Sequence, residues 1–299
     1  MEQKFHIPVM CAEAIDFLNL SAGKTIVDAT LGTGGHSLKI LERISPGGRL
    51  IGIDRDEAAI NIAKARLADY GGSCSFLHGN FSDIDKMLAG LAIDKVDGIL
   101  FDLGVSSLQF DNPLRGFSFQ GDGPLDMRLD QTSHISAYDL VNNLNEDELS
   151  ELLWNFGQER WHNRIARYLV KEREKSPIST TKELSRVVIE AIPYRFRHGR
   201  IHAATRTFQA LRVAVNRELE SLEIAVHKAL QLLKENGRIC VISFHSLEDR
   251  VVKFSFRDAA AKGMLKIMTP KPLVPSEQEA AQNPRARSAK FRAGERIVA

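Results

Sequence analysis

The first hundred or so residues alternate between short apolar runs, rich in β-branched residues, and segments with helical spacing, and this alternation constrains the fold most strongly. The runs predicted as strands are residues 25–29, 49–54, 74–77 and 96–103. Helical patterns at residues 38–44 and 58–67 separate the first three of them. A strand, a helix and a second strand form a βαβ unit, so we predict an α/β domain with a parallel sheet covered on both faces.

The sheet pattern stops at Gly104. Residues 111–130 are dense in Gly, Pro and Asp without any period, which predicts a long ordered loop with a function. Beyond the loop the pattern is helical. Helix caps are predicted where Glu follows a capping residue at a spacing of three, as in Asn145 with Glu148 and Thr180 with Glu183.

One longer helix is predicted through the apolar positions from 208 to 233, ending at residues 236–237. Residues 238–244 then form another buried strand, so the sheet resumes after the helices; weaker strands are predicted at 265–268 and 289–298. The sheet domain is therefore discontinuous. We assign residues 1–110 and 205–299 to it, and residues 111–204 to an inserted loop and all-helical domain for substrate recognition.

Composition excludes several classes of protein. With 299 residues, 43% of them hydrophobic and 26% charged, the chain can bury a hydrophobic core. The net charge is only +2, so any polyanion partner must be bound by local basic patches. Cys11, Cys74 and Cys240 are far apart, which argues against a disulfide framework and a zinc–thiolate site and favours a reducing cytoplasm. Residues 1–5 suggest neither a signal nor a transit peptide, and no apolar stretch is long enough to span a membrane.

A glycine-rich segment, residues 28–36, lies where the first strand becomes a helix. Glycines at such a turn let the backbone lie against a ligand at the carboxyl edge of the sheet. Asp54 ends the second strand, twenty residues after Gly34, where an acid accepts hydrogen bonds from both hydroxyls of a ribose. The glycine segment alone also fits a simple tight turn, but the pair predicts an adenosine-containing cofactor.

The identity of that cofactor depends on two further residues. The third glycine of a dinucleotide-binding loop is replaced by Ser37, and Asp28 would repel phosphates. S-adenosylmethionine has no pyrophosphate, and Asp28 is suitable for contact with its ammonium group. We therefore predict a Rossmann-like S-adenosylmethionine-dependent methyltransferase fold with an inserted all-helical domain.

Two other residues follow strands of this sheet. Phe81 comes just after the third strand and fits either an adenine-binding wall or the core. Asp102 ends the fourth strand, where a lone buried carboxylate costs several kcal/mol unless it is paired or functional. We favour a functional Asp102.

Methyl transfer needs mainly the correct positioning of a nucleophile. For an exocyclic base amine, acceptors near the amine protons loosen its conjugation with the ring, and Asp102 with the loop at Ser106 can supply them. The Asp/Asn-Pro-Pro-aromatic run of many amine methyltransferases is absent from residues 102–109. His245, after the next strand, fits three roles equally: proton acceptor, acceptor-binding residue or buried structural histidine.

Two basic segments favour a nucleic-acid partner. No acidic residue occurs from 191 to 217, and Tyr194 and Phe196 lie among its arginines. The tail, residues 285–296, adds further arginines and Phe291. Each segment alone also fits a solvated face, and each aromatic side chain fits either base stacking or the core. The basic residues are Arg195, Arg197, His198, Arg200, His202, Arg206, Arg212 and Arg217 in the first segment and Arg285, Arg287, Lys290, Arg292 and Arg296 in the second.

Taken together, runs along almost the whole chain resemble the family of bacterial ribosomal small-subunit RNA methyltransferase H (RsmH or MraW). The order of the runs is more specific than any one of them. They are residues 6–10, 30–37, 52–56, 102–107, 115–119, 123–128, 205–212, 243–250 and 283–285. The sequence departs from the family at Gln158, where Glu is usual, and at Ala203, where Pro is usual.

The resemblance implies N4-methylation of a decoding-centre (P-site) cytidine in 16S rRNA, within a largely assembled small subunit, with S-adenosylmethionine as the donor. It implies that the cofactor-binding residues are Gly34, Gly35, His36, Asp54, Phe81, Asp102 and Gln109. The predicted catalytic residues are Asp102, Ser106 and His245, and no metal is expected.

Two alternative functions belong to other classes. An NAD-dependent oxidoreductase is favoured only by the glycine segment and opposed by Ser37 and Asp28. A non-catalytic rRNA-binding assembly factor would need only the basic segments. The expected location is the cytoplasm, without membrane contact. The sequence is compatible with a homodimer but does not determine the oligomeric state.

Overall fold

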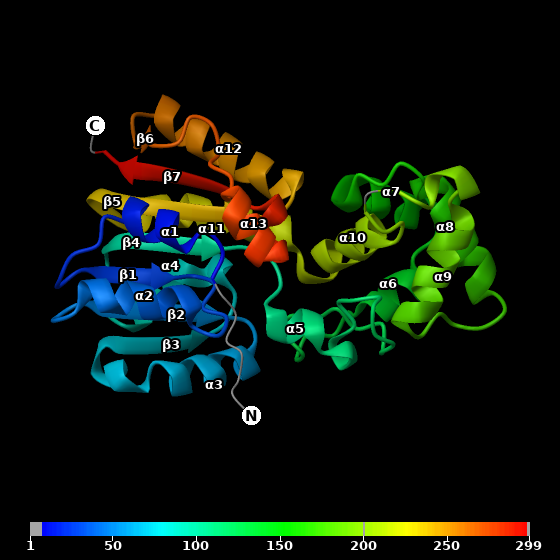
Figure 1. Cartoon of the computed structure of the whole chain (residues 1–299), viewed down its shortest axis with the longest axis horizontal. Helices are drawn as coiled ribbons and strands as arrows, with labels where there is room; N and C mark the ends of the chain where they lie inside the picture. The colour runs from blue at the N-terminus through cyan, green and yellow to red at the C-terminus, as the bar shows by residue number, and fades with distance from the viewer. Residues whose placement is uncertain (1–7, 200, 298–299) are drawn as a thin grey trace. The chain divides into compact units, whose positions relative to one another are not determined.

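The computed structural model describes residues 8–199 and 201–297 and divides the chain into two compact units (Figure 1). The sheet unit comprises Met1–Gly104 and Leu219–Ala299, and the helical unit comprises Val105–Glu218. These boundaries differ from the expected ones at 110/111 and 204/205, because residues 205–218 pack with the helical core. The predicted features at residues 1–7, Arg200 and Val298 lie outside the described residues.

The sheet unit is built on seven strands in the order β3-β2-β1-β4-β5-β7-β6, which Figure 1 shows from bottom to top. The first five strands run parallel, and β7 is antiparallel to both β5 and β6. The strands are β1 (Thr25–Asp28), β2 (Arg49–Asp54), β3 (Cys74–His78), β4 (Val96–Asp102), β5 (Leu233–Ser243), β6 (Leu265–Ile267) and β7 (Lys290–Arg296). The predicted α/β, Rossmann-like architecture is confirmed, as are the seven predicted strands, with shifted ends.

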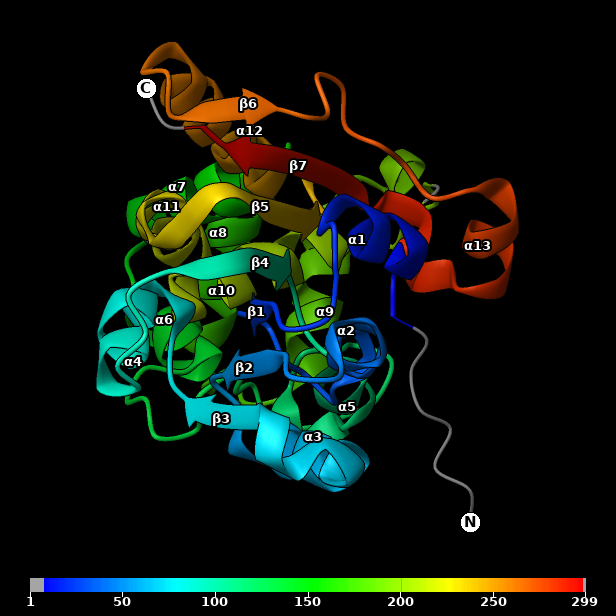
Figure 2. The same cartoon turned by 90° about the vertical axis from the view of Figure 1, so that its left-hand side faces the viewer.

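Helices cover both faces of this sheet, as Figure 2 shows for α1 and α2 on one side and α4 on the other. The helices of the unit are α1 (Cys11–Phe17), α2 (Gly35–Ile44), α3 (Glu57–Arg66), α4 (Ile84–Gly90), α11 (Glu218–Leu232), α12 (Ser246–Ala261) and α13 (Glu277–Gln282). Neighbouring strand residues enter opposite cores: Val27 and Ile99 pack with α4, α11 and α12, whereas Ile26 and Leu100 pack with α1, α2 and α3. This double covering explains the continuous apolar runs of the strands.

The single long helix predicted over residues 208–233 is wrong. The structure has two helices, α10 (Thr205–Asn216) and α11, separated by Arg217 in the left-handed region at φ 50°. The second helix also ends at Leu232, before the expected stop at residues 236–237. There the chain enters β5 directly, through a register irregularity opposite β4.

The helical unit has its own hydrophobic core. Its helices are α5 (Ser107–Asp111), α6 (Ala137–Asn143), α7 (Glu146–Gly157), α8 (His162–Arg173), α9 (Thr181–Ala191) and α10, with a 3-10 turn, η4 (Tyr194–Phe196), between the last two. Both predicted capping boxes are confirmed, at Asn145 before α7 and at Thr180 before α9. Such reciprocal bonds satisfy amide groups at a helix start that lack helical partners.

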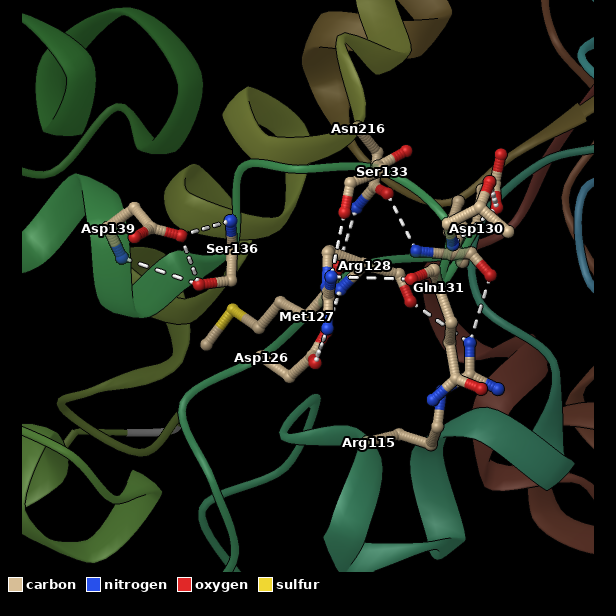
Figure 3. Close-up of polar contacts among 12 residues, drawn as sticks. Arg115, Asp126, Met127, Arg128, Asp130, Gln131, Ser133, Ser136, Asp139 and Asn216 are labelled. Atoms are coloured by element: carbon tan, nitrogen blue, oxygen red, sulfur yellow. Dashed lines mark hydrogen bonds and ion pairs between the residues drawn. The ribbon is translucent and has the colours of Figure 1, made fainter.

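The loop predicted at residues 111–130 is fixed by polar contacts, shown in Figure 3. The buried Arg115 donates to the carbonyls of Arg128 and Leu129, both at 3.0 Å. Asn216, at the end of α10, accepts from the Leu129 amide and donates to the Met127 carbonyl, both at 2.8 Å. The loop is therefore ordered, as its sequence predicted, and its regular secondary structure is limited to the end of α5 and one 3-10 turn, η3 (Pro113–Arg115).

Within the described part of the chain, no helix combines the length and the apolar character that a membrane span requires. The thiols of Cys11, Cys74 and Cys240 are free.

Candidate functional site

The carboxyl ends of β1, β2 and β4 meet at one edge of the sheet. Asp28 at the end of β1 is in register with Gly52 of β2 and Leu100 of β4. Asp54 lies two residues beyond Gly52, and Asp102 lies two residues beyond Leu100. Asp28, Asp54 and Asp102 therefore share this edge of the sheet. The strand order reverses at β1, and ligands of open α/β sheets bind at such a switch point.

The glycine segment turns at this edge and is fastened to it. Gly32 and Gly34 have φ values of 50° and 78°, in the region that favours glycine, and Gly34 caps the start of α2. The Gly32 amide donates to Asp54 Oδ2 at 2.7 Å, and the Asp56 amide donates to Oδ1 at 2.9 Å. The Arg55 amide also donates to this carboxylate, which offers about four acceptor sites in all, so acceptor capacity remains for a ribose hydroxyl.

Asp28 lies beneath the loop rather than on its surface. The side chain is 1% exposed, accepts a hydrogen bond from Ser37 Oγ at 2.7 Å and accepts another from the Thr30 amide at 3.3 Å. Burial raises the pKa of Asp28 to about 6. Its observed role is to hold the loop to α2, which differs from the direct ammonium contact that the sequence suggested.

His36 and Asp102 form a pair at the same edge. His36 Nε2 lies 3.0 Å from the Val9 carbonyl oxygen, and Nδ1 lies 3.4 Å from Asp102 Oδ2. A carbonyl only accepts, which assigns the proton to Nε2 and directs Nδ1 at Asp102. The other oxygen, Asp102 Oδ1, is buried and has no hydrogen-bond partner among the described residues. The Asp102 amide is held by Thr30 Oγ1 at 2.6 Å.

The electrostatics of this edge favour a cation. Burial, with the charges of Asp28 and Glu248, raises the pKa of Asp102 well above its usual value. Burial also raises the pKa of Asp54. A positive charge bound here would lower these pKa values and relieve the repulsion. The sulfonium and ammonium groups of S-adenosylmethionine carry such charges, so the carboxyl groups fit this cofactor.

The other predicted cofactor residues of the sheet unit lie around the same loop. Gly35 begins α2, and a Cβ there would be 3.4 Å from Pro8. Phe81 is half-buried and packs edge-on against Phe101, with ring centroids 5.7 Å apart. Its packing satisfies the core role and leaves an adenine contact as a prediction.

Ser106 and Gln109 belong to the helical unit. Ser106 is the N-cap of α5: its Oγ accepts from the Gln109 amide at 3.4 Å, and Gln109 Oε1 accepts from the Ser106 amide at 3.0 Å. Gln109 is 3% exposed. Both residues therefore hold the start of a short helix, and their roles at the reaction centre stay predictions.

His245 is likewise a helix cap. Its Nδ1 accepts from the Glu248 amide at 3.3 Å, at the start of α12. The buried Glu248 accepts in return from the amides of Phe244 and His245, at 2.7 and 3.2 Å. His245 Nε2 is buried and has no hydrogen-bond partner among the described residues, so the three roles considered for His245 stay predictions.

Sequence reasoning missed two contributors to the site. Thr30 was included only as part of the glycine segment, although its hydroxyl holds the end of β4. Glu248 raises the pKa of Asp102, and only its capping-box spacing from His245 signals it. In the tail, Phe291 is fully buried, which is the core role among the two considered. The buried Arg292 donates to Asp249 Oδ1 at 2.7 Å, so this arginine is engaged within the protein.

The sheet topology, the glycine turn and the acids at its edge define the class of S-adenosylmethionine-dependent methyltransferases, with S-adenosylmethionine as cofactor. The model of the MraW methylase family matches residues 3–297. The chain belongs to this family, which confirms the resemblance of the sequence runs and disfavours an NAD-dependent oxidoreductase.

Two relatives of this chain carry the same name. The ribosomal RNA small subunit methyltransferase H of Geotalea uraniireducens (strain Rf4) is 50% identical, covering 99% of this chain and all of that protein. The protein of the same name from Trichlorobacter lovleyi is 47% identical, with the same coverage. Among solved structures, an rRNA methylase from Streptococcus thermophilus has a TM-score of 0.46 at 12% identity, covering 96% of this chain and 95% of that one.

Proposed function

We propose that this protein transfers a methyl group from S-adenosylmethionine to N4 of a decoding-centre (P-site) cytidine in 16S rRNA of the small ribosomal subunit. The names of both relatives support small-subunit rRNA as the substrate. The cytidine and its N4 atom rest on the family resemblance and on the acid at the end of β4. Such a substrate implies work in the cytoplasm, and the helical unit is proposed to recognise it.

The observation that carries the proposal is the unsatisfied oxygen of Asp102. A buried acceptor without a partner costs about 1–3 kcal/mol, so it marks a position for a ligand donor. Asp102 Oδ1 is such an atom among the described residues. We assign it to an N–H of the exocyclic amine. A hydrogen bond there draws the nitrogen lone pair out of conjugation with the ring.

His36 keeps this acceptor available. When Asp102 is protonated, the proton can lie on Oδ2, which faces His36 Nδ1 as the acceptor. Oδ1 therefore remains an acceptor whether or not the pair holds that proton. When S-adenosylmethionine is bound, it supplies an electrophilic methyl group on a cationic sulfur. The proton that the amine loses passes to Asp102, to His245 or to water.

The proposed cofactor contacts surround the glycine turn. Asp54 accepts hydrogen bonds from the ribose hydroxyls through its remaining lone pairs, and the backbone of the turn lies against the methionine part. The residues proposed to bind the cofactor are Gly34, Gly35, His36, Asp54, Phe81, Asp102 and Gln109. Ser106 is proposed to shape the loop that presents the amine.

A methyl-incorporation assay tests this function. Small subunits lacking the modification are incubated with the protein and methyl-labelled S-adenosylmethionine, and the rRNA nucleosides are separated by mass spectrometry. We expect label in N4-methylcytidine and its loss with Asp102→Ala. Label at carbon 5 of cytosine, or on protein, would refute the proposed acceptor; absence of transfer would favour a non-catalytic assembly factor.

A further inference from the structure

The helical unit exposes aromatic rings that methyl transfer does not use. Tyr194 is 73% exposed and Phe196 is 38% exposed, and both belong to η4. Trp161, before α8, lies against Phe196 with ring centroids 5.2 Å apart. Exposed rings of this size leave apolar area in water, so a cluster of them suggests a binding surface.

Arginines stack on these rings. The guanidinium carbon of Arg160 lies 5.3 Å from the ring centroids of both Trp161 and Phe196. That of Arg195 lies 4.7 Å from the Phe196 ring. Stacking holds the face of a guanidinium on a ring and directs the N–H groups at its edge elsewhere. With Arg197 over the ring of Tyr194 at 5.8 Å, these residues form what we call the arginine–aromatic surface: Arg160, Trp161, Tyr194, Arg195, Phe196 and Arg197.

The positive charge of this surface is not neutralised locally. Neither Arg160 nor Arg195 is paired with a carboxylate of the described residues. The adjacent acid, Glu159, is 4% exposed and accepts from the Trp161 amide at 2.9 Å. Its carboxyl group is therefore directed into the protein and forms no ion pair with Arg160 or Arg195 among the described residues.

Arginines elsewhere on the same unit behave differently. Arg186 pairs with both Glu172 and Glu190, and Arg167 pairs with Glu146. Both arginines are exposed helix residues with carboxylate partners. The arginine–aromatic surface is therefore distinct from an ordinary solvated helix face, where opposite charges are mixed.

We propose that the arginine–aromatic surface binds RNA of the small ribosomal subunit, with the edges of Arg160 and Arg195 on backbone phosphates and the Tyr194 ring stacked on an unpaired base. The identity of this RNA rests on the proposed function. An acidic protein would need only the arginines, whereas rings beside arginines match the phosphates and base faces of RNA.

Binding of the full-length protein to unmodified small subunits, measured by filter binding over a range of salt concentrations, tests this proposal. The double variant Arg160→Ala/Arg195→Ala should bind about tenfold or more weakly, and its salt slope should fall by about two. The matched control, Arg167→Ala/Arg186→Ala, removes the same charge from the same unit and should bind within about twofold of wild type. Tyr194→Ala removes a ring that is largely in water and should bind about tenfold more weakly.

Unchanged affinity and salt slope in the double variant, or equal loss in the control pair, would overturn the proposal. Purified 16S rRNA serves as a second probe and should show the same loss. A loss seen with intact subunits but not with rRNA would identify a protein partner and also overturn it. Because this assay measures binding, it remains decisive if methyl transfer to cytidine is not observed. Thermal unfolding and S-adenosylmethionine affinity of the variants should match wild type.

Discussion

Asp28 couples the stability of the site to pH. Its folded pKa of about 6 lies above the usual 3.8, so the folded protein binds more protons than the unfolded chain between these values. Its contribution to the free energy of unfolding is therefore present at low pH and is lost as pH rises from about 4 to about 6. Asp28→Asn removes this dependence. Relative to wild type, the free energy of unfolding of the variant, measured by urea unfolding, should rise by about 3 kcal/mol between pH 4 and pH 7. A parallel pH dependence of the two proteins would contradict the assignment, and Asp94→Asn, at an exposed position, is the control.

Asp54 connects the glycine turn to the proposed ribose site. Asp54→Ala removes the carboxylate that accepts hydrogen bonds from the Gly32 and Asp56 amides and, as proposed, from the ribose. Affinity for S-adenosylmethionine, measured by calorimetry, should fall by about tenfold to a hundredfold, as expected for hydrogen bonds to a charged group. Asp94→Ala should leave it unchanged. Equal affinity of Asp54→Ala and wild type would show that the ribose lies elsewhere.

At the scale of elements, the turn between β1 and α2 depends on glycine at one position. Gly34 has φ 78°, and a Cβ there would lie 3.3 Å from Leu67 Cδ1. Gly34→Ala should lower the free energy of unfolding by about 1–2 kcal/mol, because L-residues are strained in this region. It should also weaken S-adenosylmethionine binding in the same calorimetric titration. Gly90→Ala at the end of α4, where a Cβ meets nothing within 4 Å, should do neither; similar losses in both variants would exclude a special role of Gly34.

The cap of α5 separates two roles of Ser106. Ser106→Ala removes the cap and should cost about 1 kcal/mol, with reduced methyl transfer. Ser106→Asn restores a capping oxygen without the hydroxyl, and we expect it to retain most of the transfer rate. If both variants lose activity to the same extent in the methyl-incorporation assay, the hydroxyl itself acts at the amine and the capping role does not explain the residue.

Strands and caps were predictable from sequence because their causes are local. A strand covered on both faces must be apolar throughout, and a capping box has fixed spacing, as at Thr180. The break at Arg217 was missed because neither Gly nor Asn marks its left-handed conformation. The pairing of His36 with Asp102 was also missed, since it depends on which strands are neighbours in the sheet.

At the scale of the whole molecule, the discontinuous sheet unit holds the acids and the helical unit holds the arginine–aromatic surface. The pattern of strands predicted that the chain leaves the sheet and returns to it. The positions of the boundaries could not be predicted in the same way, because they depend on which core α10 packs with. An amphipathic helix pattern does not specify which core a helix joins.

A crystal structure of this protein with S-adenosylmethionine tests most directly whether the carboxyl ends of β1, β2 and β4 form the cofactor site. We expect the ribose hydroxyls within about 3 Å of the Asp54 carboxylate, the methionine part against the turn at Gly34, and the methyl group directed toward Asp102. A cofactor bound away from the carboxyl ends of β1, β2 and β4 would contradict it.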